Sequence, residues 1–178
     1  MKTLETIQKT CKVFHILAKV AMILSFVWAG LNAVGVVCCI IWHSIGVDPS
    51  SFIDVALFEE NGGVIKTIGV LSADFVFGLT DGISFLFATQ YLKKELEDGT
   101  PFTLEGADKV KSLGIKTIVM PLVAVIISAV IYASFGLSQY EKFSNGAPVV
   151  LGIALILVSL ILRHGAELRG ETNDNAQD

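Results

Sequence analysis

Charged residues are scarce in this chain, and several long stretches contain none. Only 17% of its 178 residues are charged and 53% are hydrophobic, with a mean hydropathy of +0.68. A soluble domain usually has about a quarter charged residues. The net charge of -4 also disagrees with the basic surface that binding to nucleic acid requires. The composition therefore favours lipid as the surroundings and excludes direct nucleic-acid binding.

The residues that build common metal and catalytic sites are also few. Cys11, Cys38 and Cys39 are the only cysteines, and two of them are neighbours within one apolar stretch. A disulfide framework needs several spaced pairs. The sequence has no phosphate-binding glycine loop, no nucleophile elbow and no zinc-protease motif. We therefore predict a protein that is not an enzyme, with no catalytic residues, no metal and no cofactor.

Apolar stretches, in contrast, are abundant. Each has about the length at which a helix crosses a bilayer, near 20 residues. We predict an all-α membrane protein, a four-helix transmembrane bundle in which residues 1–170 form one domain and residues 171–178 a polar disordered tail. The predicted spans are residues 20–41, 64–91, 117–137 and 147–162.

Basic residues indicate the orientation of these spans. If both termini and the 93–116 connection lie on one side, that side holds eleven of the 13 lysines and arginines. Only Lys66 and Lys142 then lie on the other side. Such a bias in short loops marks the cytoplasmic face. We therefore predict that the N-terminus and the C-terminus are both cytoplasmic.

The second span contains two acids, Asp74 and Asp81, which are costly in hydrocarbon unless they are paired, solvated or protonated. Helical periodicity places them on one stripe with Gly78 and Gly82. One interpretation is a polar intramembrane site that handles protons or cations, with Asn32 of the first span as a further member. The other is a packing interface, in which Gly78-x-x-x-Gly82 permits close helix approach and protonated carboxyls bond Asn32, Ser25, Ser128 or Tyr132 on neighbouring helices.

The inner connection offers a candidate contact with a soluble partner. Gly99 and Pro101 end the second helix, and Thr103 is placed to cap the third. Phe102 then presents an aromatic ring at a turn, where such a ring is a good interface anchor. Alternatively, Phe102 packs against its own hairpin and stiffens the turn.

Two segments carry a resemblance to a known family. The connection Tyr91–Phe102, with its Gly-x-Pro-Phe turn, and the run Leu162–Glu171, with its Arg-x-Gly-x-x-Leu pattern, resemble a group of bacterial four-helix integral membrane proteins known as a domain of unknown function. The polar run Thr172–Asn175 departs from the family pattern. The resemblance implies location in the bacterial cytoplasmic (inner) membrane and a gene often beside a helix-turn-helix regulator. It implies no catalytic residues.

Two functions follow as hypotheses. The first is a non-enzymatic sensor or regulatory partner of a cytoplasmic helix-turn-helix regulator, contacted through Gly99, Pro101 and Phe102. The alternative is a small ion- or proton-coupled transporter or channel that uses Asp74 and Asp81. Either protein is embedded in the lipid bilayer, and a homo-oligomer is compatible with both.

Overall fold

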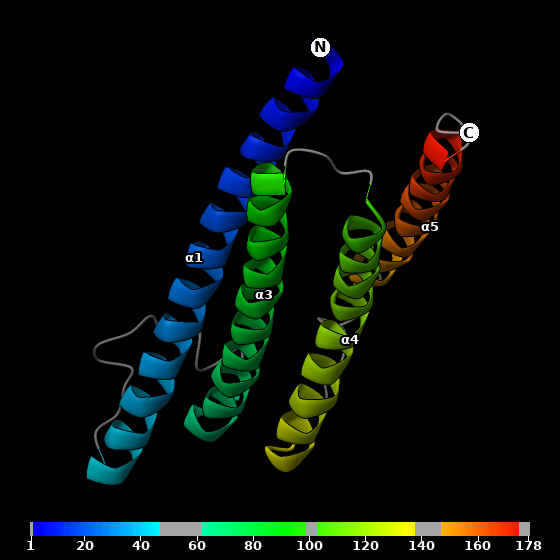
Figure 1. Cartoon of the computed structure of the whole chain (residues 1–178). Coiled ribbons are helices and arrows are strands. Elements are labelled where there is room, and N and C mark those ends of the chain that lie inside the picture. The colour runs from blue at the N-terminus through cyan, green and yellow to red at the C-terminus, as the bar shows by residue number, and fades with distance from the viewer. Residues whose placement is uncertain (1, 47–61, 99–102, 138–146, 175–178) are drawn as a thin grey trace. The chain divides into compact units, whose positions relative to one another are not determined.

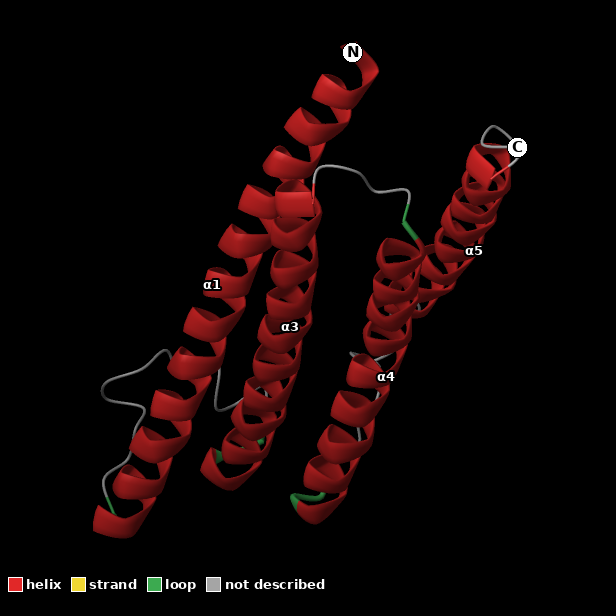
Figure 2. Cartoon of the chain, viewed as in Figure 1, coloured by secondary structure: helices red, strands yellow, loops and turns green. Residues whose placement is uncertain are grey.

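The structure is a computed structural model that describes residues 2–46, 62–98, 103–137 and 147–174. The described residues form long helices (Figure 1) and include no strand (Figure 2). The helices are α1 (Lys2–Ile45), α3 (Val64–Asp98), α4 (Leu104–Ser134) and α5 (Ala147–Asp174).

All four helices are long and apolar enough to cross a membrane, which confirms the predicted class of four-helix transmembrane protein. Each is longer than its predicted span, with 44, 35, 31 and 28 residues in chain order. About 20 residues suffice to cross the hydrocarbon core, so polar turns at the helix ends extend into the interface or into water. The sequence predicts a tail from residue 171, whereas α5 continues to Asp174.

Local sequence explains both ends of α4. The hydroxyl of Thr103 accepts a hydrogen bond of 2.9 Å from the backbone N–H of Gly106, which confirms the predicted cap. At the other end Gly136 adopts a positive φ of 64°. The N–H of Leu137 then donates to the carbonyl of Tyr132 at 2.9 Å, which gives the glycine-terminated motif that closes many helices.

The chain divides into two compact units. The first unit contains residues 1–22, 83–120 and 146–178, and the second contains residues 23–82 and 121–145. The single domain over residues 1–170 and the orientation of the termini stay predictions.

In both units, helices approach each other closely at glycine residues. In the first unit, a Cβ on Gly114 of α4 would lie 2.9 Å from the carbonyl oxygen of Gly152 on α5. In the second unit, a Cβ on Gly78 of α3 would lie 3.1 Å from the backbone nitrogen of Ala29 on α1. Because lipid supplies no hydrophobic drive between helices, such van der Waals contact at small residues is what holds membrane helices together.

Candidate intramembrane site

The predicted polar residues Asp74, Asp81 and Asn32 all belong to the second unit. Asp74 and Asp81 are seven residues apart on α3, which corresponds to about 10.5 Å along the axis and about 20° around it. They therefore share one face of the helix. Their neighbours nevertheless differ, so the two acids do not form one site.

Asp81 lines a pocket of about 460 Å³ between α1 and α3. Its α1 wall includes Ser25 and Trp28, and its α3 wall includes Phe77 and Gly78. No hydrogen bond or ion pair joins Asp81 to any other residue that the structure describes. The carboxylate is thus the only acid in an otherwise largely apolar and aromatic pocket.

The pocket opens toward the lipid-facing surface of the helices. Asp81 itself is exposed, and Trp28 on the pocket wall is 55% exposed. The acid lies within about 5 Å of the middle of the predicted 64–91 span, at 1.5 Å per residue. An ionised carboxylate open to hydrocarbon at this depth is costly. A proton or a bound cation would remove that cost.

Asp74 has a different environment. Its carboxylate interacts electrostatically with Tyr132 of α4, a tyrosine that is 3% exposed. One turn before Tyr132, the side chain of Ser128 is fully buried, and its hydroxyl has no partner among the described residues. Asp74 therefore belongs with a buried polar group on α4, and its contacts agree with the packing interpretation.

Asn32 does not join the acids. Its Nδ2 donates a 2.9 Å hydrogen bond to the carbonyl of Trp28 on the same helix, and the side chain is 5% exposed. No hydrogen bond links Asn32 to Asp74 or Asp81 in the part of the chain that the structure describes. The Asn32 amide is therefore hydrogen-bonded within α1, to the carbonyl of the same tryptophan that lines the Asp81 pocket.

Gly78 and Gly82 lie against α1, on either side of Asp81 in the helical stripe. A Cβ on Gly82 would lie 2.8 Å from the ring of Phe26, and a Cβ on Gly78 would meet the backbone of Ala29. Gly78 also lines the pocket. The two glycines bring α1 close to α3 where these helices form the pocket that Trp28 and Asp81 line, so packing and site geometry depend on the same residues.

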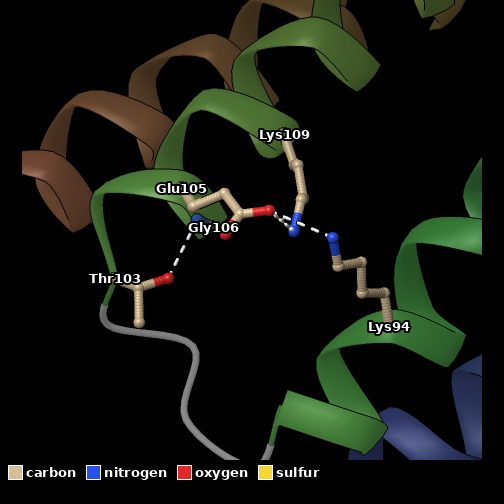
Figure 3. Close-up of polar contacts among 5 residues, drawn as sticks. All are labelled: Lys94, Thr103, Glu105, Gly106 and Lys109. Carbon is tan, nitrogen blue, oxygen red and sulfur yellow. Dashed lines mark hydrogen bonds and ion pairs between the residues drawn. The ribbon is translucent and has the colours of Figure 1, made fainter.

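The partner-contact residues Gly99, Pro101 and Phe102 lie outside the described residues. In the first unit, an ion pair joins the end of α3 to the start of α4, the two helix ends that flank these residues (Figure 3). Lys109 and Lys94 point toward Glu105 from α4 and α3, with Nζ to Oε1 distances of 2.7 and 3.0 Å. These hydrogen bonds lower the pKa of Glu105, which precedes the 117–137 span, from 4.5 to about 2. Glu105 therefore stays ionised across the physiological range.

Sequence reasoning did not assign Trp28 to the site. A signal was present, since tryptophan in membrane proteins is enriched at the two interfaces, whereas Trp28 lies near the middle of the 20–41 span. A mid-span tryptophan on the same face as Ser25 and Asn32 is therefore unusual. Its proximity to Asp81, however, depends on how α1 and α3 pack.

Comparisons with protein-family models, with curated proteins and with solved structures gave no match to this chain. Within the described residues, no group of three or more histidine, cysteine or acidic side chains could hold a metal ion. The function must therefore be argued from the site itself.

Proposed function

We propose that this integral membrane protein handles cations within the bilayer through Asp81, as a small ion- or proton-coupled transporter or channel. The observation that carries the proposal is the pocket that Asp81 and Trp28 both line, which opens onto an exposed face of α1 and α3. A carboxylate in this setting is stable only with a positive charge beside it or a proton on it. The site therefore favours exchange of a bound cation for a proton at the Asp81 carboxylate.

Trp28 narrows the class of cation. The face of an indole ring attracts a positive charge, and this attraction strengthens when water is excluded. The remaining wall is apolar, with Leu24, Leu31 and Phe77 among its residues. A pocket of about 460 Å³ with one acid and one indole suits a monovalent organic cation with an apolar body. Small inorganic ions need several oxygen ligands, which this pocket does not supply.

The first experiment measures binding of tetraphenylphosphonium to purified protein in uncharged detergent. Tetraphenylborate, an anion of the same shape, is the matched control. Trp28 and Trp42 are the only tryptophans in the sequence. We therefore expect tetraphenylphosphonium to quench tryptophan fluorescence saturably, and we expect this quenching to disappear in Trp28→Phe and to persist in Trp42→Phe. Lowering the pH should weaken binding, because protons then compete for Asp81. Equal binding of the two ions, or no saturable signal, would refute the proposal.

The regulatory role is a second proposal, supported by the charge network beside the 99–102 turn. Glu105 joins Lys94 of α3 to Lys109 of α4, so the two helix ends that flank the turn are held at a defined separation. Residues 99–102 connect these two restrained helix ends, which makes them a suitable contact for a cytoplasmic helix-turn-helix regulator, the partner class that the family resemblance implies.

We expect Phe102→Ala to weaken capture of such a regulator in mild detergent. Removal of an aromatic anchor from an interface costs about 2 kcal/mol or more, which is roughly a thirtyfold loss of affinity. Leu104→Ala is the control, because Leu104 is a neighbouring apolar side chain that is 52% exposed. The proposal fails if the regulator encoded beside the gene binds both variants as tightly as it binds the wild type.

A further inference from the structure

A second pocket, of about 200 Å³, lies in the first unit between α3 and α4. Three lysines line it, Lys94 from α3 with Lys109 and Lys116 from α4. Phe87, Tyr91 and Leu113 supply an apolar wall. The pocket thus combines converging positive charge with a surface that suits hydrocarbon.

The charge of this pocket is only partly neutralised. Glu105 is the carboxylate bound to Lys94 and Lys109, at 3.0 and 2.7 Å (Figure 3). The Nζ of Lys116 lies 4.0 Å from the centroid of the Phe87 ring, and no carboxylate of a described residue pairs with it. The residues that line the pocket thus carry three ammonium groups and no carboxylate, and Glu105 bonds to two of these groups from outside the lining, so the pocket is complementary to an anion.

Its position along the helices indicates where the anion comes from. The predicted spans end at residue 91 in α3 and begin at residue 117 in α4, so Lys94 and Lys116 lie within one turn of these limits, and Lys109 lies about 12 Å before the α4 span. This is the level at which phospholipid phosphates meet the acyl chains. A ligand at this level can place its phosphate among the lysines and its chain along Phe87 and Leu113.

We propose that this pocket is a binding site for the phosphate of an anionic phospholipid. Lys116, held over the Phe87 ring, and Lys109 donate to the phosphate oxygens, and the hydroxyl of Ser112 on the pocket rim adds a neutral donor. Glu105 competes with the phosphate for Lys94 and Lys109. Removing its charge is therefore expected to strengthen lipid binding.

The experiment adds phosphatidylglycerol at low mole fraction to the full-length protein in uncharged detergent, and measures bound lipid by native mass spectrometry. Lys109→Gln/Lys116→Gln removes two pocket charges. Lys93→Gln/Lys111→Gln removes the same net charge from exposed lysines that do not line the pocket. Because hydrogen bonds to charged groups are worth about 1.5–3 kcal/mol, we expect the pocket variant to bind at least about tenfold more weakly. The control variant should stay within about threefold of the wild type.

Three further arms complete the test. Glu105→Gln should bind phosphatidylglycerol more tightly than the wild type, and phosphatidylcholine, which has no net charge, should bind weakly to every variant. Inorganic phosphate should not displace the lipid. Displacement by phosphate would replace the lipid assignment with a free-phosphate site. Equal losses in the two double variants, or equal binding of the two lipids, would overturn the site altogether.

Discussion

Asp81→Asn is expected to abolish organic-cation handling while leaving the protein folded. At an effective dielectric constant of about 20 and a separation of about 5 Å, a carboxylate attracts a monovalent cation by about 3 kcal/mol. Loss of that charge should weaken tetraphenylphosphonium binding by about a hundredfold. In proteoliposomes, cation movement driven by a pH gradient should disappear, because asparagine has no exchangeable charge.

Two variants make this result specific. Asp108→Asn makes the same chemical change at an exposed residue of α4 outside the pocket, and should behave as the wild type. Asp74→Asn changes an acid whose neighbour is Tyr132, and should alter stability more than cation affinity. If Asp81→Asn binds the cation with wild-type affinity, the pocket is not the site and the packing interpretation of both acids stands.

Gly78→Leu is expected to unfold or strongly destabilise the second unit. Even a single Cβ on Gly78 would lie 3.1 Å from the backbone nitrogen and 3.2 Å from the Cα of Ala29. Backbone atoms cannot rotate away as a flexible side chain can, so α1 would have to move. Overpacking of this kind costs about 1–3 kcal/mol, and a leucine should reach the upper end. The loss can be measured as the free energy of unfolding in a detergent titration.

Gly30→Leu is the matched control for this substitution. Gly30 lies on α1, and a Cβ there would meet nothing within 4 Å. Leucine is also the better helix former, so the control should be neutral or slightly stabilising. If both variants lose the same stability, the close approach at Gly78 is not what holds α1 and α3 together. If only Gly78→Leu loses stability, that variant should also bind tetraphenylphosphonium more weakly than the wild type.

Much of the fold could be predicted because it depends on local chemistry. The apolar runs identified the four described helices that are long and apolar enough to span a membrane, and Thr103 is the cap of α4 as its sequence context predicted. Asp81 could be recognised as unusual because an acid in mid-span is costly wherever the helix lies. The extents of the helices could not be predicted as well, since polar turns such as residues 171–174 continue a helix without being apolar.

In contrast, the sequence does not predict which of several candidate neighbours each polar side chain contacts. Helical periodicity places Asp74 and Asp81 on one face, yet one interacts with Tyr132 and the other lines a pocket with Trp28. Asn32, which the sequence allows as a partner of either acid, bonds instead to the carbonyl of Trp28. A hydrogen bond inside its own helix is available to asparagine at no cost in chain entropy, so it competes well with a bond to another helix.

The sequence by itself determined that the four described helices are long and apolar enough to span a membrane and that Thr103 caps α4, because these features depend on hydrophobic length and on neighbouring residues. Only the tertiary structure decided that Trp28 and Asp81 line one pocket and that three lysines from α3 and α4 line another. These contacts join residues far apart in the chain, through helix packing at glycines that leaves no local pattern to indicate which helix approaches.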